Sequence, residues 1–166
     1  MKSHELFQRM SPALAAEIFT FLQREQKPVY KAAINGLASQ RNLRGVFIER
    51  KPPQERHPWM QAALTRPLSD ALANHLVQAW LLGAEKEMLC DFLDGLGIAH
   101  EPDGTVEELP ASPPKEKIKT AIDKLLAKYA PERVAVYLHA FQDAESSVQW
   151  PALNGILRED QRLRFA

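Results

Sequence analysis

Apolar residues recur every three to four positions along most of this chain, which is the spacing that places them on one face of an α-helix. The pattern is clear in residues 12–26 and 28–42, and again in residues 69–83 and 85–96. Prolines stand where several of these stretches begin, at a position where the missing backbone N–H costs no hydrogen bond. The pattern therefore predicts a series of helices that start at or near a proline.

The second half of the chain follows the same rule. Ser112 is expected to cap an amphipathic helix that ends at Pro131, because serine favours the N-cap position. Pro131 starts another helix, a break follows at Ser146-Ser147, and a last helix spans residues 150–158. We therefore predict an all-α fold, a helical bundle or short helical array of about 7–9 helices.

Two segments lie outside the helical pattern. In residues 43–56, the triplet from Val46 to Ile48 is too short to separate a strand from a helical turn, and we favour the turn. A short helix is expected after Pro58. Residues 98–114 contain four prolines, an Asp-Gly pair and an acidic run, which predicts one long loop.

The loop at 98–114 is also the place where a domain boundary would fall. The residues beyond it would make a marginal domain alone, since small domains bury little of their surface. We therefore predict that residues 1–166 form a single α-helical domain, with a possible sub-boundary inside the loop.

Charge separates the chain into two parts, although 21 Lys and Arg residues balance 21 Asp and Glu residues. Residues 1–67 hold 11 basic and 5 acidic residues, whereas residues 68–166 hold 10 and 16. Such a split suggests a nucleic-acid surface on the basic part, or head-to-tail contact between the halves, within one chain or between copies. A mixed, solvated surface would give the same count.

Composition adds an expectation about location. Cys90 is the only cysteine, so no intramolecular disulfide can form, which favours a reducing compartment such as the cytoplasm. The N-terminal ten residues lack the apolar core of a signal peptide, and the longest unbroken apolar run is 79–84. We therefore expect no membrane segment.

Chemical motifs are sparse. The chain has no glycine-rich phosphate loop, no CxxC pair and no HExxH helix, so we expect no cofactor. A looser set of acids, histidines and the cysteine would form a metal-dependent or nucleophilic site if the helices brought it together. Its members are His75, Cys90, Asp91, Asp94, His100 and His139.

A basic stretch at 24–56 is the strongest candidate for contact with nucleic acid or with a partner, because clustered cations neutralise phosphates or acidic surfaces. Its members are Lys27, Lys31, Arg41, Arg44, Arg50, Lys51 and Arg56. Trp59 and Trp150 each stand beside a proline at an expected helix start, and a partly exposed tryptophan is a common anchor for a partner. Trp80 lies in the densest apolar stripe and is expected in the core.

Three segments repeat the order apolar, Asn or Asp, Gly, apolar, at 34–37, 93–96 and 153–156. An old duplication and chance both account for them. A glycine in a helix also lets a neighbouring backbone approach closely, with no ligand involved.

Helical arrays that lack catalytic motifs commonly present a face to a partner. We therefore expect a protein–protein interaction or adaptor module without catalytic activity, whose partner is another protein or a second copy. Nucleic-acid binding through the stretch at 24–56 and a metal-dependent enzyme with an acid and histidine site are the alternatives.

Overall fold

The protein is all-α, as its sequence predicts. The computed structural model describes residues 1–144 and 150–165, and within this part of the chain it contains ten α-helices, two short 3₁₀ helices and no strand. The chain forms two compact units, residues 1–80 and 81–166, and the division falls inside the helix that ends at Ala84.

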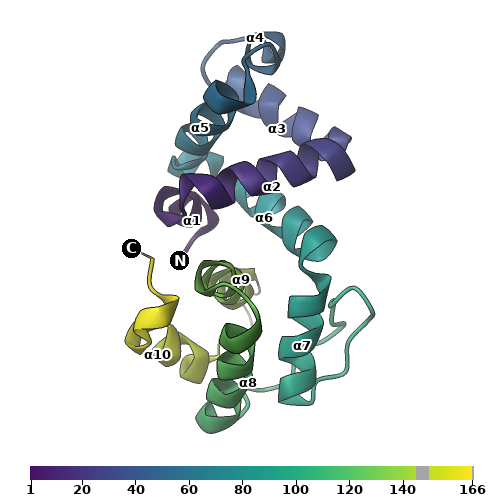
Figure 1. Ribbon diagram of the computed structural model, residues 1–166, viewed down its shortest axis with the longest axis vertical. Helices are drawn as coiled ribbons and strands as arrows, with labels where there is room; N and C mark the ends of the chain where they lie inside the picture. The colour runs from purple at the N-terminus through teal and green to yellow at the C-terminus, as the bar shows by residue number, and fades with distance from the viewer. Residues whose placement is uncertain (145–149, 166) are drawn as a thin grey trace. The chain divides into compact units, whose positions relative to one another are not determined.

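The first unit contains six α-helices and a 3₁₀ helix. They are α1 (Ser3–Arg9), α2 (Pro12–Glu25), α3 (Lys27–Ser39), α4 (Gly45–Glu49), α5 (Pro53–Leu64), η1 (Pro67–Ser69) and most of α6 (Asp70–Ala84) (Figure 1). α2 packs against both α3 and α5, and α1 packs against α5. The rings of Phe7 and Phe19 stack at a centroid distance of 5.9 Å in the buried centre of this unit.

The second unit is built around four helices. They are α7 (Lys86–Leu96), α8 (Lys115–Lys128), α9 (Pro131–Ala144) and α10 (Pro151–Glu159), followed by η2 (Gln161–Leu163) (Figure 1). An aromatic cluster joins α7, α9 and the start of α10: Phe141 lies 5.6 Å from Phe92 and 5.1 Å from Trp150, ring centroid to ring centroid. Edge-on contacts of this kind add stability beyond the apolar area that they bury.

α7 and α8 approach each other closely at Gly95. A Cβ atom at this position would lie 3.2 Å from the Cβ of Ala121, so a larger residue would push the helices apart. α7 ends at Gly97, which has a left-handed backbone with φ of 70°, as the sequence predicts.

Several helix boundaries differ from the prediction. Pro58 does not start a helix, because α5 already begins at Pro53 and Pro58 lies inside it. Ser112 does not cap α8: the helix begins three residues later, after Pro114, and the Ser112 hydroxyl donates to the carbonyl of Pro113. The break expected at Ser146-Ser147 lies outside the described residues.

The segment at 98–114 is a long connection without a helix, as predicted, and it lies within the second unit. The division between the two compact units therefore falls before this loop. The single cooperative domain expected from the sequence stays a prediction. Among the helices of the described residues, none has both the length and the apolar character needed to cross a membrane.

Candidate functional site

The connection from α3 to α5 presents the most unusual combination of side chains in the first unit. α3 ends at Ser39, and Asn42 then adopts a left-handed backbone with φ of 56°. The N–H of Leu43 donates to the carbonyl of Ala38 at 2.9 Å, which closes the turn. Gly45 then starts α4, and a Cβ there would overlap the side-chain oxygen of Asn35. A larger residue at position 45 would therefore require the Asn35 side chain to move.

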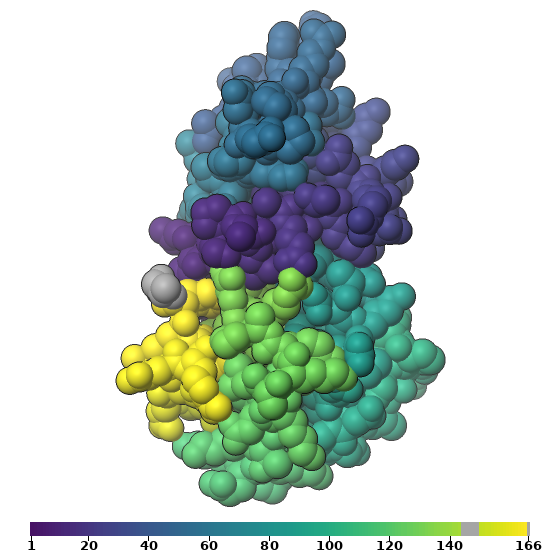
Figure 2. Space-filling view, viewed as in Figure 1, coloured from purple at the N-terminus to yellow at the C-terminus, as the bar shows by residue number. Residues whose placement is uncertain are grey.

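α4 exposes apolar side chains to solvent. Of its large residues, only Ile48 is buried and holds the helix against the unit. Leu43, Val46 and Phe47 are 43%, 41% and 56% exposed. The atoms of this region form an exposed end of the first unit (Figure 2). Exposed apolar groups gathered in this way are typical of interaction sites.

Three exposed arginines, Arg41, Arg44 and Arg50, occur in the same segment. Within the described residues, none of their guanidinium groups forms an ion pair with a carboxylate. The Arg41 guanidinium lies 5.7 Å from the ring centroid of Trp59, in a cation–π arrangement. We call the six residues Arg41, Leu43, Arg44, Val46, Phe47 and Arg50 the α4 surface.

Arg56 does not belong to this surface, which corrects the sequence prediction. Its side chain is buried, and one terminal nitrogen donates to the carbonyls of Glu49 and Lys51 at 3.2 and 2.9 Å. The other donates to the side-chain oxygen of Gln23 at 3.3 Å. Carbonyls at the C-terminal end of a helix lack helical partners, and a guanidinium satisfies them well. Arg56 therefore holds α4 in place rather than contacting a ligand.

The other basic residues of the predicted stretch are spread along α3. Lys27 and Lys31 are exposed on its first turns, whereas Arg41 lies beyond its last residue. A helix of this length spans about 20 Å at about 1.5 Å per residue. Lys51 is half-buried at the end of α4. The seven predicted residues therefore do not form one cluster.

The two tryptophans predicted as anchors differ. Trp59 is half-buried under Arg41, beside the α4 surface. Trp150 is only 1% exposed, and its indole N–H donates to the carbonyl of Pro110 at 3.2 Å. The prediction of a partly exposed anchor is therefore wrong for Trp150, because the aromatic cluster of the second unit covers its ring. Trp80 is buried, as predicted.

The acid and histidine set is divided among separate contacts. His75 is exposed in the first unit, and the other five members lie in the second. Asp94 and His100 form one pair, with 2.7 Å between Oδ1 and Nε2. His139 lies apart from this pair, on α9, where its ring is 5.7 Å from that of Phe165. Within the described residues, no group of three or more His, Cys, Asp or Glu side chains has the arrangement of a metal site.

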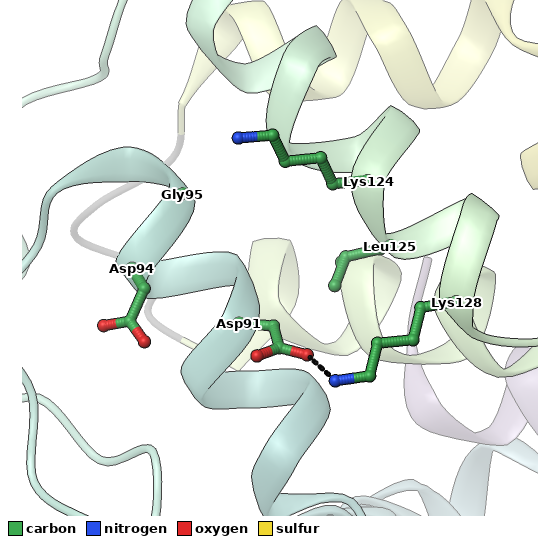
Figure 3. A pocket seen from close by; sticks show the side chains of 6 residues that line it. All are labelled: Asp91, Asp94, Gly95, Lys124, Leu125 and Lys128. Carbon is green, nitrogen blue, oxygen red and sulfur yellow. Dashed lines mark hydrogen bonds and ion pairs between the residues drawn. The ribbon is translucent and has the colours of Figure 1, made fainter.

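Asp91 is engaged by two neighbours at a hollow of about 400 Å³ between α7 and α8 (Figure 3). It accepts hydrogen bonds from the Tyr129 hydroxyl at 2.7 Å and from Lys128 Nζ at 2.9 Å. Lys128 also donates to Glu87 at 2.7 Å. Asp94, Gly95, Lys124 and Leu125 complete the walls (Figure 3).

The electrostatics of this hollow oppose base or nucleophile chemistry. Hydrogen bonds to Glu87 and Asp91 raise the pKa of Lys128, so its amine stays protonated. Burial and the Asp91 carboxylate raise the pKa of Tyr129 to about 12. Burial and the carboxylate of Asp94 likewise raise the pKa of Cys90. A nucleophile or general base at neutral pH needs the opposite shift in each of these groups. The hollow is an ion-paired helix contact.

Sequence reasoning missed the apolar members of the α4 surface. Their signal was present, because Leu43, Val46 and Phe47 lie among arginines in a segment too short to bury them all. In the structure Ile48 alone of the predicted triplet faces the core. No protein-family model, curated protein or solved structure matches the chain.

Proposed function

We propose that the protein is an interaction module that binds an acidic, partly apolar segment of a partner protein on the α4 surface. One observation carries the proposal: three exposed apolar side chains lie in one short segment with three arginines that have no carboxylate partner in the described residues. Covering the apolar groups removes them from water, which is the main favourable term in protein association. Aromatic residues and arginine are also the types most enriched at binding hot spots.

The charge of the surface selects the partner. Between residues 41 and 51 the chain carries Arg41, Arg44, Arg50 and Lys51 but only one acid, Glu49. A carboxylate on the partner would receive paired N–H donors from a guanidinium, which gives both strength and orientation. Complementary charge also raises the association rate at low salt. The cytoplasm is part of this proposal, since the single cysteine favours a reducing compartment.

Nucleic-acid binding is the second candidate, and Phe47 is the observation that favours it. Its ring is 56% exposed and lies between Arg44 and Arg50 in sequence. Aromatic rings with neighbouring cations serve as stacking platforms for the bases of single strands. Such binding weakens steeply with salt, because each phosphate contact releases counterions.

Photo-crosslinking from position 47 tests the proposal. A benzophenone amino acid would replace Phe47 in one variant and Leu68 in a control, since Leu68 is the most exposed apolar side chain outside the α4 surface. Both variants would be irradiated in the cells that contain the protein. We expect adducts from position 47 but not from position 68, and loss of these adducts when Arg44→Glu and Arg50→Glu are added.

The chemistry of the adduct decides between the candidates. An acidic protein segment in the captured material, lost in the double arginine variant, supports the proposed function. An adduct that nuclease removes and protease does not would favour the nucleic-acid candidate instead. Equal labelling from positions 47 and 68 would contradict any special role for the α4 surface.

A further inference from the structure

The second unit contains a surface with the opposite charge. Between residues 98 and 114 the chain carries Glu101, Asp103, Glu107 and Glu108 and no lysine or arginine. Glu107 and Glu108 are exposed, and the apolar side chains on either side of them, Val106 and Leu109, are half-buried. We call Val106–Leu109 the acidic segment.

The acidic segment is fastened at both ends. On one side the N–H of Glu101 donates to the carbonyl of Thr105 at 2.8 Å, and Asp94 holds His100. On the other side the carbonyl of Pro110 accepts the indole N–H of Trp150. Between these points, residues 106–109 form no hydrogen bond with any described residue. Their backbone donors and acceptors are therefore open to water or to a bound chain.

A hollow of about 320 Å³ lies along this segment. The residues that line it are three acids, Glu101, Glu107 and Glu108, together with Val106, Ala99, Thr105 and His100. The α4 surface is its counterpart in charge and in apolar character, since the exposed Phe47 lies between the exposed Arg44 and Arg50 in the sequence. A ring placed in such a hollow would lose water, and its neighbouring guanidinium groups would meet carboxylates.

We infer that the α4 surface of one copy binds the acidic segment of a second copy, so that the chain associates head to tail. This inference rests on the proposed function and names the partner for the same surface. Two different surfaces meet in such a contact, so each pair leaves one α4 surface and one acidic segment free. Association of this kind continues until it closes into a ring or grows into a filament.

Sedimentation equilibrium of the full chain over a range of concentration and salt tests the inference. One variant, called the tip variant, would carry Arg44→Ser and Phe47→Ser in the α4 surface. A second, called the segment variant, would carry Glu107→Gln and Glu108→Gln in the acidic segment. A matched control would carry Lys27→Ser and Leu68→Ser, which also removes one exposed cation and one exposed apolar side chain, but outside the α4 surface. All six positions are outside the core, so circular dichroism should show unchanged helix content in every variant.

We expect the wild-type mass to rise above the monomer with concentration at low salt and to fall as salt is added. The tip and segment variants should each weaken association about tenfold or more, and the control should match the wild type. A mixture of the tip and segment variants should form one heterodimer and nothing larger, because only one complementary pair of surfaces remains.

Three outcomes would overturn the inference. A wild-type chain that stays monomeric up to about 1 mM has no such contact. Association that neither variant weakens uses another interface, and a mixture that stays monomeric shows that these two surfaces do not pair. If the purified chain is monomeric but position 47 still captures another acidic protein in cells, self-association fails while the proposed function stands. If neither test responds to the α4 variants, both fail.

Discussion

The basic residues of the two units differ in what surrounds them. In the second unit several cations are held by acids: Arg162 contacts both Asp123 and Asp160, and Lys128 contacts both Glu87 and Asp91. In the α4 surface the three arginines have no carboxylate partner within the described residues. These cations of the two units therefore differ in whether an acid of their own unit already holds them.

This difference shows why a charge count alone does not locate a binding site. A cation that already bridges two helices of its own unit gains little from an external acid, because it would first have to leave its partners. A cation without such a partner gains the full favourable energy of an ion pair with the external acid. The arginines of the α4 surface are therefore better candidates for binding than the ion-paired cations of the second unit.

Replacement of Arg56 should have the largest effect on stability. Arg56→Met keeps the aliphatic packing but leaves the carbonyls of Glu49 and Lys51 and the amide of Gln23 without their donor. Gln23 and Glu49 are exposed and Lys51 is half-buried, so water replaces part of the lost hydrogen bonding. We therefore expect a loss of about 1–2 kcal/mol in the free energy of unfolding, measured by urea denaturation. Arg50→Met, an exposed control, should change it by less than about 0.5 kcal/mol. Equal effects of the two variants would contradict the structural role of Arg56.

A smaller effect should separate paired cations from unpaired ones. Arg162→Ala removes contacts of 2.8 Å to Asp123 and 2.7 Å to Asp160, whereas Arg44→Ala removes no ion pair. Because the Arg162 pairs are partly exposed, we expect a loss of only about 0.5–1 kcal/mol at low salt. Arg44→Ala should leave stability unchanged and weaken binding instead. Urea titrations at low and high salt measure the stability of both variants, and a large loss of stability in Arg44→Ala would remove the distinction.

The smallest expected effects are changes in how stability varies with pH, and they have opposite signs in the two units. Burial, together with repulsion from Arg56, lowers the pKa of His57 below its ordinary value of 6.5. Its contribution to stability is therefore complete above about pH 6.5 and is lost as the pH falls toward the folded-state pKa. Hydrogen bonds to the Glu101 carbonyl and to Asp94 raise the pKa of His100. Its contribution is complete below about pH 6.5 and is lost as the pH rises through the folded-state pKa.

Two variants test these signs. His57→Phe keeps a ring beside Phe19 and should make stability fall less between about pH 7.5 and 5.5. His100→Gln should make it fall more over the same range. Urea midpoints at the two pH values measure both changes, and identical pH dependence in the wild type and both variants would show that neither histidine titrates differently on folding.

The sequence predicted the helices well where apolar spacing and a proline agree. α2, α3 and α9 begin at or next to the expected prolines, and α7 ends before Gly97 as expected. Pro58 misled the prediction because α5 contains two prolines and starts at the first, Pro53. The apolar pattern alone does not show which of two nearby prolines starts a helix.

The glycines of the three apolar-Asn/Asp-Gly-apolar segments differ in how closely other residues pack against them. Gly95 does permit a close approach, since Ala121 lies against it. A Cβ at Gly36 would make only an ordinary contact with Leu72, and one at Gly155 would meet no atom within 4 Å among the described residues. Close packing therefore explains one of the three glycines.

The basic stretch at 24–56 was the part of the candidate site that could be predicted, because charged residues are identified directly from the sequence. The apolar members of the α4 surface could not be predicted, since the exposure of Phe47 depends on how α4 packs through Ile48. The burial of Arg56 depends on carbonyls that only the folded α4 brings to it. The positions of these residues in the sequence indicate neither the exposure of Phe47 nor the burial of Arg56.

The sequence by itself determined the all-helical fold, most helix starts and the unequal distribution of charge, because apolar spacing, proline and charge act locally or are fixed by composition. Only the tertiary structure decided which cations are paired, that Arg56 and Trp150 are buried, and that Phe47 is exposed. These properties depend on partners distant in the chain, such as Gln23 for Arg56 and Pro110 for Trp150, and therefore on packing.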